Sequence, residues 1–189
     1  KRISPEAPVP VLKEESREYM LGGAANVAAN IASLSGKPTL LGFIGQDSEG
    51  EKIVELSEEA GIIFIPTYEG DTIVKTRPIS IDHQAQQLLR IDREKNDPKY
   101  FEQELILKEA EKAELIVVSD YAKGAITPEL MKTLLQSGKK IIVDPKPKNR
   151  DLYKGVFLIK SNERESMLMS SCKDVGNAGN FLKEYLRDP

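Results

Sequence analysis

Short polar clusters follow three strongly apolar segments of this 189-residue sequence, and these clusters carry the side chains best suited to chemistry. If the apolar segments are parallel strands, their carboxyl ends meet at one edge of a sheet, which is where α/β proteins bind ligands. Lysines beside carboxylate, hydroxyl and amide oxygens suit an anionic ligand with a polyol or a metal component. The clusters are Asp120, Tyr121 and Lys123; Asp144, Pro145 and Lys146; and Ser161, Asn162 and Glu165.

A second candidate is the pair Gly22 and Gly23, which stands directly before a run of helix-forming residues. With no side chains at that point, ligand oxygens can closely approach the backbone N–H groups of a helix N-terminus. Asn26 lies one turn further on and offers both a donor and an acceptor, as a sugar hydroxyl requires. A structural alternative stays open, in which the glycines shape a loop and Asn26 is a satisfied interior amide.

The segments that position these residues alternate between apolar runs and amphipathic repeats. The apolar runs predict buried, mostly parallel strands, and the repeats predict helices on both faces of the sheet, which is an α/β fold. We expect strands at 38–45, 62–66, 114–120, 139–145 and 156–162, and helices at 23–35, 48–61, 98–113, from 127, from 163 and up to about 187.

Several of the expected helices carry capping signals at their first residues. Ser48 and Glu51 stand at capping-box spacing, and Thr127 followed by proline favours a helix start. Asp47 belongs to a Gly-x-x-Gly-x-Asp-x-x-Gly pattern, which we interpret as turn geometry and helix capping rather than chemistry.

Two segments differ from the rest of the sequence, because their patterns are extended, alternate between apolar and polar residues, and are rich in charge. Residues 1–19 begin with a proline-rich stretch that excludes a helix and a central strand. Residues 71–92 contain two strand-like runs joined by a polar turn around Asp82. We expect both segments to form a small separate sheet, and residues 20–70 and 93–189 to form the α/β core.

The composition excludes several classes of protein. Lysine and arginine number 27 against 30 aspartates and glutamates, so the formal charge of −3 provides no basic field for nucleic acid. No apolar run approaches the roughly 20 residues of a membrane helix. The single cysteine, Cys172, cannot form an intrachain disulfide, which favours a reducing, cytoplasmic setting. Because the sequence starts without methionine and ends directly after a helical pattern, we expect a piece of a longer protein.

Six motifs occur in the order found in one family of enzymes. They are RISPEAPVPV, GGAANVAANIASL, QQLLRID, SDYAKG, DPK and SNERE. In these motifs, and over residues 1–173, the sequence resembles the ribokinase-like carbohydrate kinases. Among them it is most similar to those that phosphorylate heptose 7-phosphate in ADP-heptose synthesis for bacterial lipopolysaccharide. The resemblance implies a three-layer sandwich with a mostly parallel central sheet and a small β-sheet lid.

For the sugar end of the site, the resemblance implies three groups of residues. Gly22, Gly23 and Asn26 would contact sugar hydroxyls. Asp120 and Lys123 would reach the substrate from a strand end. The lid would grip the substrate, including its 7-phosphate, through Arg2, Lys75, Arg77, Gln87 and Arg90. The alternative is that cations on edge strands only prevent aggregation.

For the nucleotide end, the resemblance implies that ATP and Mg²⁺ bind beyond the last strands. Lys146 would lie near phosphate groups, Asn162 would lie near the nucleotide phosphates, and Glu165 would hold magnesium through water. Each residue also has a structural alternative. Lys146 can be a lysine of a proline-rich turn, and Asn162 with Glu165 can be a capping box.

The residue that the family uses as catalytic base has no counterpart here. It is an aspartate in a Gly-x-Gly-Asp segment, and no such segment occurs in the sequence. The family's first strand, with its acidic sugar contact, has no counterpart either. The resemblance therefore implies no catalytic residue in this chain. We expect the parent protein, but not this chain alone, to transfer the ATP γ-phosphoryl group to the anomeric hydroxyl of heptose 7-phosphate.

Other functions stay open on the sequence alone. One is another sugar kinase of the same fold, acting on a fructose phosphate or on ribose, although an unphosphorylated substrate would not need the cations Lys75, Arg77 and Arg90. Another is a non-catalytic module that binds or senses a sugar phosphate, and a third is a scaffold whose lid mediates dimerisation. Because exposed sheets often pair with a second copy, we expect a homodimer through the lid.

Overall fold

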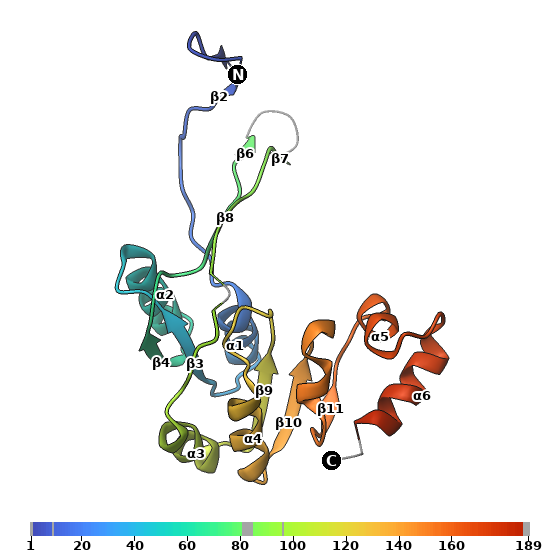
Figure 1. Ribbon diagram of the computed structural model, residues 1–189. Coiled ribbons are helices and arrows are strands. Elements are labelled where there is room, and N and C mark those ends of the chain that lie inside the picture. Colours follow the sequence, from blue (N-terminus) through green and yellow to red (C-terminus); the bar gives the residue numbers. More distant parts are fainter. Residues whose placement is uncertain (1, 9, 81–84, 96, 187–189) are drawn as a thin grey trace.

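The computed structural model describes residues 2–8, 10–80, 85–95 and 97–186, apart from the side chains of residues 2, 3 and 10. The helices are α1 (Gly23–Ser33), α2 (Ser48–Glu59), α3 (Gln103–Lys112), α4 (Pro128–Gln136), α5 (Glu163–Ser170), α6 (Val175–Tyr185) and the 3₁₀ helix η1 (Pro147–Tyr153). The core strands are β3 (Thr39–Ile44), β4 (Ile63–Tyr68), β9 (Leu115–Ser119), β10 (Lys140–Asp144) and β11 (Leu158–Ile159). The strands that project from the core are β1 (Arg2–Ile3), β2 (Pro10–Val11), β5 (Val74–Thr76), β6 (Ile79–Ser80), β7 (Gln86–Gln87) and β8 (Ile91–Arg93) (Figure 1).

The core is built from parallel strands and the helices that cover them, as the sequence predicts. β3 pairs with β4, and β10 lies between β9 and β11, all in parallel. Within the described residues the two groups of strands share no ladder, and α1 packs against both β3 and β9 (Figure 1). Because β9, β10 and β11 are parallel neighbours, their carboxyl ends meet at one edge, which is the edge that carries the polar clusters.

The main hydrophobic core lies around β9 and β10. Alternate residues of β10 are buried, as expected for a strand with one face packed against the core. The 3₁₀ helix η1, which the sequence does not predict, adds a tyrosine with 0 % exposure to this core. The buried cluster consists of Ile106, Val118, Met131, Leu134, Ile141, Val143, Tyr153, Met169 and Leu182. In the part of the chain that the structure describes, no helix is long and apolar enough to cross a membrane.

Two of the predicted helix starts are confirmed. The Thr127 side chain accepts a hydrogen bond from the Leu130 N–H, and Pro128 is the first residue of α4. The capping box of α5 is present in full, because Asn162 and Glu165 each accept a hydrogen bond from the other's backbone N–H. Local sequence signals are therefore sufficient at these two positions.

Two other helix starts differ from the prediction. The cap of α2 is Asp47, whose side chain accepts from the Gly50 N–H, so the expected capping box of Ser48 and Glu51 is wrong. The Asp47 carboxylate, one position before Ser48, already accepts the hydrogen bond from the Gly50 N–H. Helix α3 begins at Gln103 rather than near 98, because the Lys99 N–H donates to a loop carbonyl and holds this stretch extended.

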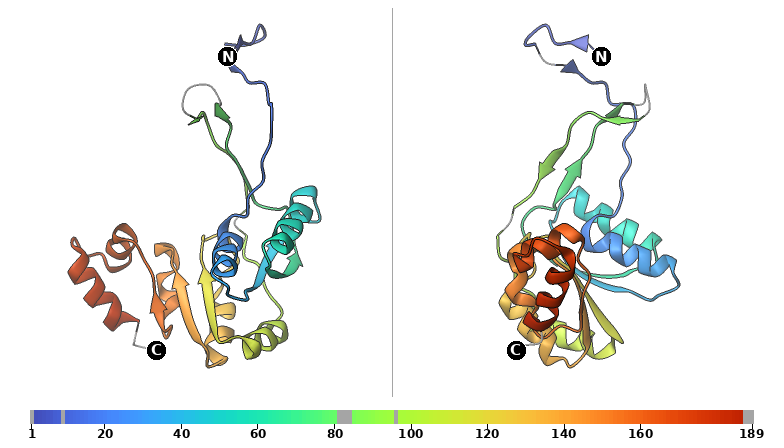
Figure 2. Two further views of the ribbon diagram at one scale, coloured as in Figure 1. Left: turned by 180° about the vertical axis from the view of Figure 1, so that it is seen from behind. Right: turned by 90° about the vertical axis from the view of Figure 1, so that its right-hand side faces the viewer.

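The projecting segments form three separate two-stranded ladders rather than the single small sheet that the sequence predicts. β1 pairs with β2, β5 with β8 and β6 with β7, all antiparallel. Proline has no N–H to donate to a ladder, and Pro78 separates β5 from β6. Both segments rise from the same side of the core (Figures 1 and 2). The turn predicted around Asp82 and the expected end of the last helix near 187 lie outside the described residues.

Candidate functional site

The carboxyl ends of β9 and β10 are joined by the buried carboxylate of Asp120, which is 1 % exposed. Its Oδ1 accepts from the Ala122 N–H at 2.6 Å. Its Oδ2 accepts from the Asn149 amide at 2.7 Å and from the Tyr153 hydroxyl at 2.5 Å. The Asp120 N–H donates to the Asp144 carbonyl at 3.0 Å. Asp120 is therefore held by interior partners, and its expected contact with substrate stays a prediction.

The Tyr153 hydroxyl extends this network to the loop that follows β10. It accepts a hydrogen bond from the Lys146 N–H at 2.9 Å while it donates to Asp120. Burial, and then the hydrogen bond to Asp120, raise the pKa of Tyr153 far above its ordinary value, so the hydroxyl stays protonated. The backbone of Lys146 is thus fixed from the interior of the protein.

The side chain of Lys146 contacts the residues expected at the nucleotide end. Its Nζ lies 3.0 Å from Glu165 Oε1, and Glu165 Oε2 accepts from the Asn162 N–H at 3.1 Å. The hydrogen bond that Lys146 donates to Glu165 is the main cause that raises the pKa of Lys146. Burial favours a neutral Glu165, but hydrogen bonds from Asn162 and Lys146 outweigh it and hold the pKa of Glu165 below its ordinary value. The structure brings all three residues together. Asn162 and Glu165 therefore form the capping box and also lie beside Lys146 at the rim.

Tyr121 lies between the double-glycine turn and Lys146. A Cβ on Gly23 would lie 3.8 Å from the Tyr121 ring, and the Lys146 Nζ is 5.6 Å from the centre of that ring. Gly23 has a φ of +55°, a conformation that favours glycine, whereas a side chain on Gly22 would meet open space. Asn26 is exposed on the first turn of α1, so the interior-amide alternative is wrong.

Three of the expected substrate cations form one cluster with two carboxylates at the base of the projecting strands. The Lys75 Nζ lies 2.9 Å from Asp92 and 2.8 Å from Glu94. The Arg90 Nε lies 2.8 Å from Asp92, and the Lys123 Nζ lies 2.5 Å from Glu94. Hydrogen bonds with Lys123 and Lys75 hold the pKa of Glu94 below its ordinary value. Glu94 thereby connects the projecting strands to the loop after β9, and the cluster keeps one excess positive charge.

Of the other three residues expected to grip the substrate from the lid, the structure describes the side chains of two. The Arg77 guanidinium donates to the backbone carbonyl of Lys75 at 3.5 Å. Gln87 is exposed on β7. Arg2 lies on β1 opposite Val11, and its side chain is outside the part that the structure describes.

Thr72, which precedes β5, anchors that strand in the core and is 2 % exposed. Its hydroxyl donates to Asp47 at 2.6 Å and accepts from the Gly45 N–H at 2.9 Å, and its N–H donates to Asp47 at 2.9 Å. A Cβ on Gly50 would lie 2.3 Å from the Gly45 carbonyl oxygen, so this joint excludes side chains there. The interpretation of the glycine pattern as turn geometry and helix capping is confirmed.

Replacing Asp47 with asparagine is expected to lower the free energy of unfolding by about 1–2 kcal/mol at pH 7, because the Thr72 N–H would face an amide donor. Burial disfavours the charged carboxyl, but hydrogen bonds from Thr72 and Gly50 outweigh it and hold the pKa of Asp47 below its ordinary value. A lowered pKa contributes stability above the unfolded value and loses it as the pH falls through the folded value. The difference between the two proteins should therefore shrink below a pH of about 4.

Urea unfolding between pH 3 and pH 7 measures this difference. Asp174 provides the matched control, because it caps α6 and accepts hydrogen bonds from Asn177 and Gly176, which lie within three residues of it. Asparagine is as good a cap as aspartate, so Asp174→Asn should change stability by less than about 0.5 kcal/mol. Equal losses at both positions would contradict the anchoring role of Thr72.

Sequence reasoning missed four residues that complete the site. Tyr153 and Asn149 lie in the unpredicted helix η1, and Glu94 and Thr72 lie in or beside charged strand-like runs. Proline at the first position of η1 was the one local signal for that helix. Nothing local marks Glu94 and Thr72, because the partners that hold them lie 19 to 29 residues away in the sequence.

Glu165 is the residue present that fits a magnesium ion bound through water. Magnesium keeps several waters and uses one or two carboxylates together with nucleotide phosphates. Both Glu165 oxygens already accept hydrogen bonds, which suits a water-bridged contact better than direct ligation. Among the described residues there is no group of three or more metal-ligating side chains, so this chain would supply only part of such a site.

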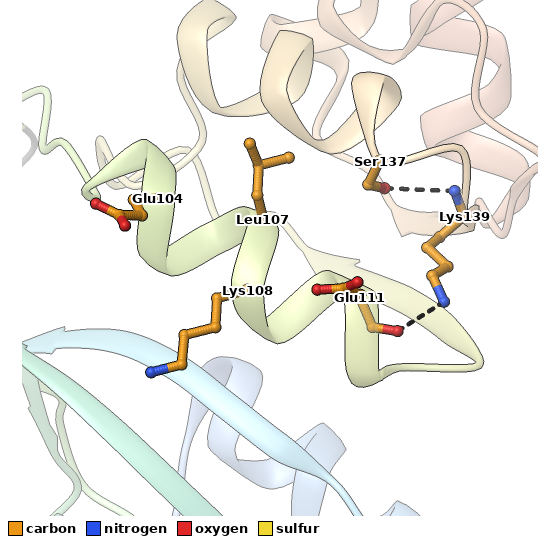
Figure 3. A pocket seen from close by; sticks show the side chains of 6 residues that line it. All are labelled: Glu104, Leu107, Lys108, Glu111, Ser137 and Lys139. Atoms are coloured by element: carbon orange, nitrogen blue, oxygen red, sulfur yellow. Dashed lines mark hydrogen bonds between the residues drawn. The ribbon is translucent and has the colours of Figure 1, made fainter.

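A shallow cavity of about 410 Å³ lies away from this rim, between α3 and the turn that precedes β10 (Figure 3). That turn is at the amino end of β10, opposite the edge that carries Lys146. The Lys139 ammonium donates to the Glu111 carbonyl there at 3.0 Å. The cavity is therefore separate from the candidate site.

Known proteins match the chain along almost its whole length. The model of the pfkB family of carbohydrate kinases matches residues 1–187. The chain is 40% identical over 196 residues to the bifunctional protein HldE of Hydrogenovibrio crunogenus, which covers 99% of this chain and 40% of that protein. It is 38% identical over 193 residues to HldE of Caulobacter vibrioides, covering 94% of this chain and 38% of that protein. The chain spans about two fifths of the length of these relatives.

Solved structures share the fold at lower identity. Arabidopsis thaliana ribokinase, complexed with ribose and ATP, matches with a TM-score of 0.72 and 17% identity, over 93% of this chain and 61% of that one. The tetrameric inhibited form of Escherichia coli phosphofructokinase-2 matches with a TM-score of 0.70 and 18% identity, over 93% and 64%. These likenesses confirm the ribokinase-like α/β fold, and with the family match over residues 1–187 they show that the chain belongs to the pfkB family of carbohydrate kinases.

Proposed function

We propose that this chain forms the sugar-phosphate end, and the entrance to the nucleotide end, of an ATP-dependent kinase that phosphorylates the anomeric hydroxyl of heptose 7-phosphate. Membership of the pfkB family supports phosphoryl transfer to a sugar. The motifs that resemble heptose 7-phosphate kinases, and the similarity to HldE proteins, support the heptose substrate and a place in ADP-heptose synthesis. The single cysteine and the use of ATP fit a cytoplasmic enzyme.

The observation that carries the proposal is the loop after β9, which contacts the base of the projecting strands, the double-glycine turn and the Lys146 side chain. Lys123 pairs with Glu94 at the base of the projecting strands. The Tyr121 ring lies against the double-glycine turn and near the Lys146 ammonium. Asp120 connects to the loop after β10 through Tyr153. A single loop therefore holds the proposed sugar end and the proposed nucleotide end at one rim.

The residues have separate tasks in this proposal. The backbone at Gly22 and Gly23, with the exposed amide of Asn26, would bind sugar hydroxyls. The 7-phosphate would bind the cluster of Lys75, Arg90 and Lys123, whose excess positive charge suits a dianion. Arg2, Arg77 and Gln87 would complete that grip when the projecting strands close.

At the nucleotide end, Lys146 would stabilise the charge that develops on the transferred phosphoryl group, and Asn162 would lie beside the phosphates. Magnesium, held by Glu165 through water, supplies further neutralisation of phosphate charge when bound. Closure of the strands would exclude water that otherwise hydrolyses ATP. No residue of this chain is assigned as the catalytic base.

We further propose that residues 1–19 and 71–92 act as the lid over the α/β core of residues 20–70 and 93–189, and that two copies pair through it. Exposed apolar side chains on the lid support the pairing, since a lone lid would leave them in water. Their exposures lie between 41% and 56%, and they are Val11, Leu12, Ile79, Leu89 and Ile91.

The test is the initial rate of ADP release by the complete polypeptide of the reading frame that contains these residues. The substrates are D-glycero-D-manno-heptose 7-phosphate, fructose 6-phosphate and ribose, each with Mg-ATP. We expect kcat/KM for the heptose phosphate to exceed that for ribose by at least about 100-fold, because ribose has no phosphate for the cation cluster, and also to exceed that for fructose 6-phosphate. A higher value for another sugar would contradict the substrate, and no ADP from any sugar would favour a non-catalytic binding module.

A further inference from the structure

We infer that Tyr153 is a positioning residue for the nucleotide end of the site, because its hydroxyl holds the Lys146 backbone and the Asp120 carboxylate in one arrangement. The inference rests on the proposed kinase function, which gives Lys146 its phosphate. Tyr153 itself is 0 % exposed and lies beneath the rim, so it acts through Lys146 rather than on a ligand.

One oxygen atom makes the connection between two loops. The Tyr153 hydroxyl donates to Asp120 Oδ2 at 2.5 Å, in the loop after β9. The same oxygen accepts from the Lys146 N–H at 2.9 Å, in the loop after β10. The Asn149 N–H donates to the Lys146 carbonyl at 2.9 Å, so both polar groups of the Lys146 backbone are fixed from η1.

The position of the Lys146 ammonium depends on this backbone. Its Nζ lies between Glu165, at 3.0 Å, and the Tyr121 ring, at 5.6 Å, and these two residues belong to different elements. A shift of the backbone would change both contacts together. Loss of the hydroxyl would leave a buried N–H and one side of a buried carboxylate without that partner, which drives such a shift.

The test is Tyr153→Phe in the complete polypeptide, a change that removes one oxygen and keeps the packed ring. We expect KM for Mg-ATP to rise about threefold to tenfold and kcat to fall by a similar factor, as loss of one buried hydrogen bond implies, because the displaced ammonium would both bind phosphate and stabilise the transferring charge. We expect KM for heptose 7-phosphate to stay within about twofold, because Tyr153 hydrogen-bonds to Asp120 and Lys146 and not to the cluster of Lys75, Arg90 and Lys123. If Tyr153 only stabilises the fold, Tyr153→Phe would lower the melting temperature and leave both KM values at their wild-type level.

Tyr185→Phe is the matched control. Tyr185 also donates its hydroxyl to an aspartate, Asp151, but it lies on α6 and its ring packs on Phe181. We expect neither KM to change in that variant. An equal rise in KM for Mg-ATP in both variants would overturn the positioning role.

A second variant covers the case in which Tyr153→Phe does not fold. Asn149→Ala removes the neighbouring hydrogen bond to Asp120 from a half-buried position, and we expect it to raise KM for Mg-ATP about twofold to fivefold. Wild-type activity with unchanged KM in the folded variant overturns the inference alone. A wild-type protein that phosphorylates no sugar overturns the proposed function, and the inference with it.

Discussion

Replacing Lys146 with methionine is expected to lower kcat/KM of the complete polypeptide by about 100-fold to 1,000-fold, the usual cost of removing one preorganised group that stabilises transferring charge. Methionine keeps the length of the side chain and removes its charge. Lys146 lies at the carboxyl end of β10 and its ammonium is held by Glu165, so the charge is already oriented before a ligand binds. Steady-state kinetics with Mg-ATP and heptose 7-phosphate measure the loss.

Two further variants test whether the loss in Lys146→Met comes from the missing charge or from a disturbed structure. Lys148→Met removes an exposed lysine two residues later, at the start of η1, and should leave kcat/KM within about twofold. In Lys146→Met, Glu165 loses a partner, so the double variant Lys146→Met/Glu165→Gln tests whether an unpaired carboxylate causes the defect. Recovery of activity in the double variant would contradict a direct role of Lys146 at the phosphate.

Replacing Gly124 with alanine is expected to lower the free energy of unfolding by about 3 kcal/mol or more, because a left-handed backbone and a severe clash act together. Gly124 has a φ of +92°, and a Cβ there would lie 1.8 Å from the Asp97 carbonyl oxygen. The Gly124 carbonyl accepts from the Lys99 N–H at 3.0 Å, so the loop after β9 and the chain returning from the lid are in direct contact. Urea unfolding of the complete polypeptide measures the change.

Gly61 provides the control, because alanine there would adopt the same strained left-handed backbone without a steric clash. It has a φ of +71°, and a Cβ there would meet nothing within 4 Å. Gly61→Ala should therefore cost about 1 kcal/mol, the lower end of the left-handed penalty. If both alanine variants lost the same stability, the close approach of Gly124 to Asp97 would have no energetic role.

Much of the fold follows from signals that lie within a few residues of each other. The start of α4 at Pro128 and the capping box of α5 are examples, since a cap and its partner are only three residues apart. The start of α3 is the opposite case. An amphipathic pattern extends back toward residue 98, but the Lys99 N–H pairs with Gly124 across the fold, and because of that distant contact the helix begins only at Gln103.

The candidate site was predictable in its residue types and not in its connections. The polar clusters after β9, β10 and β11 do meet at one edge, as parallel strands require. The hydrogen-bond and ion-pair partners of those clusters could not be predicted from the sequence. Glu94 is one acid in a charged run that favours a solvated strand, and only the fold places it against Lys123, 29 residues later. Asp120 follows a strand, which predicts a place at the ligand edge, and only the fold connects its carboxylate to Tyr153, 33 residues away.

The position of the transferred phosphoryl group tests the central proposal most directly. The complete polypeptide would be incubated with Mg-ATP and heptose 7-phosphate, and the product followed by phosphorus-31 NMR. We predict a new phosphate resonance coupled to the anomeric proton, formed in step with ADP while the 7-phosphate resonance is retained. Phosphate on any other oxygen, or ADP formed without a new sugar phosphate, would contradict the assignment of this rim as the site of anomeric phosphorylation.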